Sequence, residues 1–130
     1  MSGEPRVARF GLAVIDTDDP ASLAAFYADL LGWPVDDSED HWVTLVGPDS
    51  VELGFQLAVN HRPPTWPRSD IPQQMHLDFY VDDLVVAVSH AERLGARPAG
   101  VSRGKYFVTL IDPSGHPFCL CLAPEKRESH

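Results

Sequence analysis

The feature that most constrains this chain is an internal repeat. Residues 42–58 align without a gap with residues 107–123, and six of these 17 positions are identical. Residues 10–16 also match residues 76–82 when Phe10 is placed opposite His76. Self-similarity of this kind indicates two copies of one supersecondary unit. We therefore predict that the two halves fold alike, so that equivalent positions can be compared.

Size and composition indicate one soluble domain. A chain of 130 residues with 44% hydrophobic residues can bury a core of its own. The net charge of −9 argues against a nucleic-acid partner, because phosphate binding requires a basic surface. No apolar run is long enough for a membrane span or a signal peptide, so no membrane partner and a cytoplasmic location are expected. Cys119 and Cys121 are expected to be reduced thiols, since strand rise separates them by about 6.5–7 Å, at the edge of disulfide reach.

Local signals predict the same element order in both halves. A strand is expected over residues 8–15, and Asp19-Pro20 begins a helix that ends at Gly32. Strands are predicted at 34–38, 42–47 and 51–59. The second half has a strand at 75–81, a helix at 83–94 closed by Gly95, and strands at 105–111 and 117–122. The second helix is expected to bury one apolar face, consisting of Leu84, Val85, Val88, Ala91 and Leu94.

The domain organisation follows from these elements. We predict a single domain over residues 1–130, with module one at about 8–59 and module two at about 75–123. Residues 60–74 contain four prolines and are expected to form a linker or lid. A large aromatic residue there, Trp66, is expected either to cover a ligand or to dock on a dimer partner.

Three motifs resemble the vicinal oxygen chelate superfamily, which includes glyoxalase I, bleomycin-resistance proteins, fosfomycin-resistance enzymes and extradiol dioxygenases. They lie at residues 19–33, 74–83 and 112–120. The resemblance implies an α+β fold of two tandem βαβββ modules that form a curved mixed sheet around a cleft. It also implies a homodimer. In metal-dependent members, four inward side chains bind a divalent cation, one each from the first and last strand of each module.

The resemblance also implies where such a metal would bind. The four positions correspond to Phe10, Gly54, His76 and Cys119, and the first two have no ligand atom. A catalytic zinc site needs about three protein ligands. We therefore expect no cofactor and no family-type metal centre. If a metal does bind, His76, Cys119 and Glu52 are the predicted ligands.

Strand alternation predicts which side chains face the cleft. On the strand at 75–81, His76, Asp78 and Tyr80 are polar and alternate with apolar residues. A histidine beside a carboxylate is suited to proton transfer near neutral pH. The candidate catalytic residues are His76, Asp78 and Glu52. The candidate ligand-binding residues are Phe10, Trp42, Gln56, Trp66, Tyr80 and Cys119.

Structural roles remain open for several of these residues. His76 can be a hydrogen-bonded cleft histidine, and Glu52 an exposed residue at a strand start. Trp42 can pack at an edge, and both cysteines can be buried fillers. The charges of residues 103–106 are expected to face water rather than an anionic substrate group.

Three functions fit the sequence. The preferred one is a protein that binds a small organic molecule without metal chemistry, as bleomycin-binding members do. The second is a metal-independent lyase, isomerase or cyclase that uses His76, Asp78 or Glu52. The third is a metal-dependent lyase or dioxygenase with unusual ligands.

Overall fold

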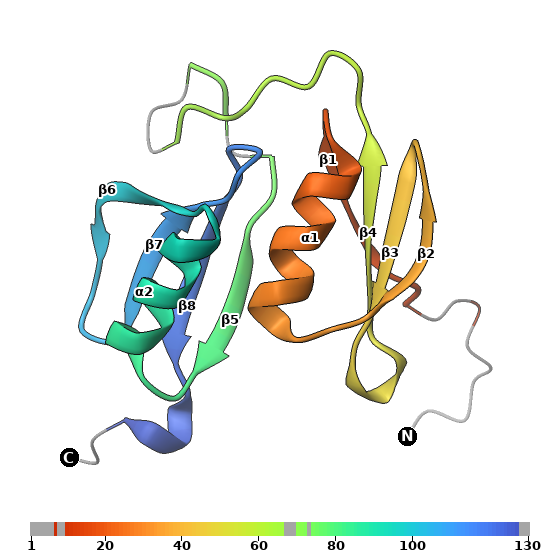
Figure 1. Ribbon diagram of the computed structural model, residues 1–130. Coiled ribbons are helices and arrows are strands. Elements are labelled where there is room, and N and C mark those ends of the chain that lie inside the picture. The colour runs from red at the N-terminus through yellow and green to blue at the C-terminus, as the bar shows by residue number, and fades with distance from the viewer. Residues whose placement is uncertain (1–6, 8–9, 67–69, 73, 128–130) are drawn as a thin grey trace.

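Two modules of the same element order make up the protein (Figure 1). The computed structural model describes residues 7, 10–66, 70–72 and 74–127. Module one contains β1 (Ala13–Thr17), α1 (Pro20–Leu31), β2 (Val35–Glu39), β3 (Trp42–Val46) and β4 (Glu52–Leu57). Module two contains β5 (Leu77–Val81), α2 (Leu84–Leu94), β6 (Arg97–Arg103), β7 (Phe107–Ile111) and β8 (Pro117–Leu122). Short 3₁₀ helices lie at Pro48–Ser50 and Pro124–Lys126.

Each module folds into its own four-stranded mixed sheet. The strand orders are β1-β4-β3-β2 and β5-β8-β7-β6. In both sheets the first strand pairs in parallel with the last, and the remaining pairs are antiparallel. This arrangement confirms the predicted α+β class of two βαβββ modules. In the described ranges, no helix has the length and apolar character needed to cross a membrane.

The helix boundaries follow from their capping residues. The Asp19 side chain accepts a hydrogen bond from the Ser22 amide at the start of α1, and Asp83 has the same position at the start of α2. Both helices end at a glycine in the left-handed region, Gly32 with φ 70° and Gly95 with φ 118°. Only glycine adopts this conformation without steric cost, which confirms the predicted helix ends.

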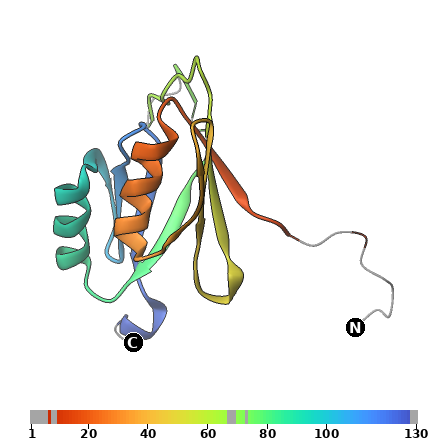
Figure 2. The ribbon, with the colours of Figure 1, turned by 45° about the vertical axis from the view of Figure 1, so that its right-hand side comes forward.

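Helix α1 joins the two sheets into one core (Figures 1 and 2). Its Tyr27 ring stacks on Phe55 of β4 at a centroid distance of 5.7 Å. The same ring lies 5.9 Å from Phe79 of β5 and 6.1 Å from Phe118 of β8. One buried aromatic ring of α1 thus contacts strands of both modules, and this joins the two sheets in a shared core.

The turn between β7 and β8 fastens module two to module one. The His116 imidazole donates from Nε2 to the Asp16 carbonyl at 2.8 Å, and the hydroxyls of Thr17 and Ser114 lie 2.7 Å apart. His61 of the connecting segment donates to the Ser114 carbonyl at 3.2 Å. These polar contacts fix the β1 end of module one against the β7–β8 turn.

Three features of the second module differ from the sequence-based expectation. Strand β6 was not predicted, because Pro98 and Gly100 are unfavourable strand residues and its pairing with β7 is irregular. Val85 was expected to be buried but is 82% exposed. Ala91 is the buried residue of α2, and the other apolar residues of that face are only half-buried.

The predicted alignment of the first strands was wrong by two residues. Val14 of β1 pairs with Gly54, and Asp78 of β5 pairs with Cys119. Since Gly54 and Cys119 are equivalent in the repeat, Val14 is equivalent to Asp78, and Leu12 rather than Phe10 is equivalent to His76. Side chains alternate with a period of two, so a shift of two residues leaves the inside–outside pattern unchanged and alternation alone cannot detect it. Residues 8 and 9 of the predicted strand lie outside the described residues.

Candidate functional site

A pocket of about 480 Å³ lies on the face of the second sheet that points away from the helices. The alternation on β5 determines this face. Leu77, Phe79 and Val81 pack against the core, whereas His76 and Asp78 are exposed. The residues that line the pocket are His76, Asp78, Lys105, Tyr106, Phe107, Cys119, Cys121 and Arg127. Polar and ionisable side chains therefore converge on one open sheet face.

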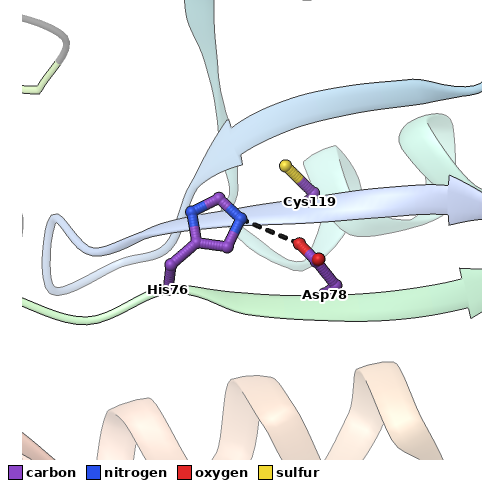
Figure 3. Close-up of side chains that lie close together, drawn as sticks. All are labelled: His76, Asp78 and Cys119. Atoms are coloured by element: carbon purple, nitrogen blue, oxygen red, sulfur yellow. Dashed lines mark hydrogen bonds and ion pairs between the residues drawn. The ribbon is translucent and has the colours of Figure 1, made fainter.

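Three of these side chains point toward one another, one from the residue just before β5, one from β5 and one from the adjacent β8 (Figure 3). Nε2 of His76 donates to Oδ1 of Asp78 at 2.8 Å. Cys119 lies on β8 directly opposite Asp78. A nitrogen, an oxygen and a sulfur of the three residues all lie within 4.8 Å of one another. We call this group the His76–Asp78–Cys119 cluster.

Both cysteines of β8 are free thiols, as predicted. Burial raises the pKa of Cys119, a hydrogen bond with Thr109 at 3.1 Å lowers it, and the charge of Asp78 together with a hydrogen bond to it raises it. Burial also raises the pKa of Cys121, and Asp78 adds to that effect. The thiol form is therefore favoured in both residues, and neither is activated as a nucleophile.

Two of the four positions that the resemblance assigns to metal ligands lie in module one and have no ligand atom. In module one the positions equivalent to His76 and Cys119 are Leu12 and Gly54, which carry no ligand atom. A Cβ at Gly54 would lie 2.7 Å from the Trp42 ring and 3.1 Å from the Leu12 side chain. Apolar groups thus occupy the corresponding space on module one. The His76–Asp78–Cys119 cluster has the three ligands that a zinc site with one open position requires.

The structure brings together only some of the predicted site residues. His76, Asp78 and Cys119 line one pocket, and Tyr80 follows on the same strand but is 69% exposed and is not among the lining residues. Glu52, Trp42 and Gln56 belong to the other sheet.

Two further predicted ligand contacts also lie elsewhere. Phe10 precedes β1 and is 82% exposed, outside the pocket. Trp66 is half-buried in the connecting segment and is not among the lining residues. Its role as a lid stays a prediction. Glu52, the predicted third ligand beside His76 and Cys119, lies on β4 of the other sheet, and the carboxylate grouped with these two residues is that of Asp78.

Five lining residues were not predicted as part of the site. Alternation places Phe107 and Cys121 on the same face as Thr109 and Cys119, so the sequence contained a signal for them. No pattern indicated Arg127, which follows the last strand in a polar segment. The remaining two residues, Lys105 and Tyr106, lie in the turn before β7.

Comparisons with known proteins agree with this fold. The model of the glyoxalase-like domain matches residues 13–121. A glyoxalase/bleomycin resistance protein/dioxygenase family enzyme from Burkholderia phytofirmans PsJN superimposes with a TM-score of 0.68, 18% identity and coverage of 87% of this chain and 97% of its own. Among curated proteins, none matches this sequence significantly.

Two bleomycin-binding proteins are also similar in structure. One, in complex with bleomycin, has a TM-score of 0.58, 19% identity and coverage of 89% of this chain and 99% of its own. The other, from Streptomyces verticillus in complex with copper(II)-bleomycin, has a TM-score of 0.57, 15% identity and coverage of 90% and 99%. At these identities the likeness demonstrates the fold alone. The family match covers most of the sequence, and the chain therefore belongs to the glyoxalase-like domain family.

Proposed function

We propose that this protein binds a small organic molecule in the module-two pocket, without a family-type metal centre. The observation that carries the proposal is the convergence of eight side chains around a space of about 480 Å³ on an open sheet face. Ligand sites for small molecules have volumes of about 300–1,000 Å³ and combine apolar walls with a few converging polar groups. Phe107 and Tyr106 supply aromatic surface here, and the His76–Asp78 pair supplies hydrogen-bonding groups.

Two lines of support come from outside the pocket. Structural relatives of the same fold include proteins solved in complex with bleomycin and copper(II)-bleomycin. The equivalent face of module one carries Leu12, Gly54 and Trp42, which offer no metal ligand at the positions of the resembling enzymes. Binding without metal chemistry fits both features.

The direct test is recovery of a ligand from the protein. Native mass spectrometry of the freshly purified chain is expected to reveal a bound small molecule that denaturation releases. The variant His76→Ala is expected to bind that molecule at least tenfold more weakly. His41→Ala is the matched control, because His41 is exposed on module one and pairs with Glu39 at 3.4 Å. Wild-type affinity in His76→Ala would remove His76 from the site.

A second candidate function is supported by the 2.8 Å contact between His76 and Asp78. A carboxylate that accepts from an imidazole orients it for proton transfer. The alternative is therefore a metal-independent lyase, isomerase or cyclase in which His76 exchanges a proton with the bound molecule. Conversion of the recovered molecule by wild type, with binding but no conversion by Asp78→Asn, would favour the enzyme over the binding protein.

The metal content separates a third candidate, a metal-dependent lyase or dioxygenase. Elemental analysis of the purified chain is expected to give less than stoichiometric zinc, nickel, manganese and iron. A stoichiometric metal that is lost in both His76→Ala and Cys119→Ala would overturn the metal-free proposal and place the ion at the His76–Asp78–Cys119 cluster.

We further propose that the protein is a homodimer. The outer faces of both sheets expose apolar side chains, among them Val14 at 41% and Phe107 at 37%. Burying such surface in a second copy would stabilise the assembly. Sedimentation equilibrium is expected to give twice the mass of 14.3 kDa; a monomer at micromolar concentration would contradict this proposal.

A further inference from the structure

Two cationic side chains gather over one aromatic ring in the module-two pocket. The Lys105 ammonium lies 5.3 Å from the centre of the Tyr106 ring, and the guanidinium carbon of Arg127 lies 5.2 Å from it. Both distances are within the range of cation–π attraction. The whole chain has 10 Lys and Arg residues against 19 Asp and Glu residues. Two cations at one ring are therefore a local reversal of the overall charge.

The Arg127 side chain is held in a way that leaves its terminal nitrogens available. Its Nε donates to the Leu122 carbonyl at 2.9 Å. A guanidinium has five N–H donors, so the four on the Nη atoms remain for a ligand. Within the described part of the chain, neither Arg127 nor Lys105 forms an ion pair with a carboxylate. A planar fork of this kind matches a carboxylate through two parallel hydrogen bonds.

The register of the sheet separates the charges along the pocket. Asp78 lies opposite Cys119, whereas Phe107 lies opposite Cys121, two residues farther along β8. Two residues of a strand span about 6.5–7 Å. Beyond Cys121, the Leu122 amide donates to the Tyr106 carbonyl at 2.8 Å. The cations therefore lie at the Cys121 end of the pocket, and the Asp78 carboxylate lies at the Cys119 end.

The electrostatic effects on Cys121 agree with this polarity. Burial is the largest cause of its raised pKa and the charge of Asp78 raises that pKa further, whereas the charge of Arg127 lowers it. The anionic Asp78 and the cationic Arg127 thus both act on Cys121, with opposite effects on its pKa. Burial, Thr109 and Asp78 are the causes that act on the pKa of Cys119.

We infer that the ligand of this pocket is a small organic carboxylate with one negative charge. Its carboxylate is held by Arg127 and Lys105, and a neutral hydrogen-bonding group at its other end contacts His76 and Asp78. A cationic group at the Arg127 end would be repelled, and a second anionic group at the other end would meet the charge of Asp78. This inference rests on the proposed function and specifies the class of molecule that the same pocket accepts.

The test compares two probes of nearly equal shape, 2-naphthoate and 2-naphthamide. Each is titrated into the full-length ¹⁵N-labelled protein, and the amide shifts of Tyr106, Phe107 and Cys121 are followed. We expect 2-naphthoate to bind at least tenfold more tightly than 2-naphthamide. The preference is expected to weaken as salt rises from about 0.01 M to about 0.5 M, because the cations are exposed and screening shortens their reach.

Matched variants assign the preference to the two cations. Arg127→Gln and Lys105→Gln are each expected to weaken 2-naphthoate binding several-fold while changing 2-naphthamide binding less than twofold. Lys126→Gln is the control. This substitution removes the same charge one residue from Arg127, and Lys126 does not line the pocket. Equal loss in Lys126→Gln would mean that net charge alone acts, and would overturn the assignment.

The outcomes separate this inference from the proposed function. If both probes bind equally well at these amides, the pocket is a ligand site without a preference for anions, so the inference fails and the proposed function stands. If neither probe shifts these amides, the carboxylate inference fails. Recovery of a native ligand then decides the proposed function independently.

Discussion

The Tyr27 hydroxyl donates a 2.7 Å hydrogen bond to the Asp112 carboxylate, across 85 residues of sequence. Both residues have 0% exposure. The other carboxylate oxygen of Asp112 accepts from the Ser114 and His116 amides at 2.8 and 3.0 Å. One buried carboxylate therefore shapes the β7–β8 turn of module two and binds the helix of module one. This contact between the modules involves none of the residues that line the pocket.

Tyr27→Phe tests the contribution of this bond to stability. The change leaves one oxygen of a buried carboxylate without its donor, which typically costs about 1–3 kcal/mol. We expect the urea midpoint to fall accordingly, with the slope of the transition unchanged. Tyr80→Phe is the control, because Tyr80 is 69% exposed, and it should remain within about 0.5 kcal/mol of wild type. Equal stability of the two variants would show that the bond adds nothing.

The turn that Asp112 shapes also makes Gly115 irreplaceable. Gly115 has φ +92°, and a Cβ there would overlap the Pro63 ring of the connecting segment. Backbone strain in the left-handed region and the overlap with Pro63 together predict that Gly115→Ala lowers the free energy of unfolding by at least about 2 kcal/mol. Thermal unfolding measures it. Gly11→Ala is the control, since nothing lies within 4 Å of a Cβ at Gly11; a loss as large in the control would contradict the argument.

Alkaline pH is expected to destabilise the protein in a way that depends on Tyr27. Burial raises the pKa of Tyr27 well above its usual value of 10.0, and the Asp112 charge and hydrogen bond raise it further. The folded state thus retains a proton that the unfolded chain releases, so stability is full below about pH 10 and falls above it. The free energy of unfolding in urea, measured at pH 8, 10 and 11, should decrease more steeply with pH for wild type than for Tyr27→Phe. If the free energy of unfolding depends on pH in the same way for both proteins, groups other than Tyr27 cause the loss of stability at alkaline pH.

Local sequence signals were sufficient for most elements because their causes are local. Asp19 and Asp83 cap helices and Gly32 and Gly95 end them through backbone geometry that neighbouring residues determine. Polar and apolar residues alternate on β5 because one face packs on the core. Strand β6 was missed because its pairing with β7, and not its own composition, makes it a strand.

The site was only partly predictable because its composition depends on tertiary placement. The sequence identified the face that carries His76, Asp78 and Cys119, since alternation within one sheet determines it. It could not show that Glu52, Trp42 and Gln56 lie on a separate sheet, or that Arg127 returns to Tyr106 after β8. The repeat located equivalent strands but not their register, which cap positions and backbone pairing determine.

The thiols of β8 provide a reporter for the charge of Asp78. Burial and then Asp78 raise the pKa of Cys121, and burial and Asp78 also raise that of Cys119, so little thiolate exists near neutral pH. The thiolate is the reactive form. Both cysteines are therefore expected to react with iodoacetamide at pH 7.5 more slowly than a cysteine in an unfolded peptide. Asp78→Asn should accelerate the reaction several-fold, because removing the nearby negative charge lowers both pKa values.

The control for this experiment is Asp82→Asn, which removes the same charge from an exposed residue just after β5. Mass spectrometry of the alkylated peptides separates the two sites. Cys119 is 7% exposed and Cys121 is half-buried, so Cys121 is expected to react first in every variant. If Asp78→Asn and Asp82→Asn react at the same rate, the Asp78 charge does not act on the thiols. The proposed charge separation in the pocket would then lack its anionic group.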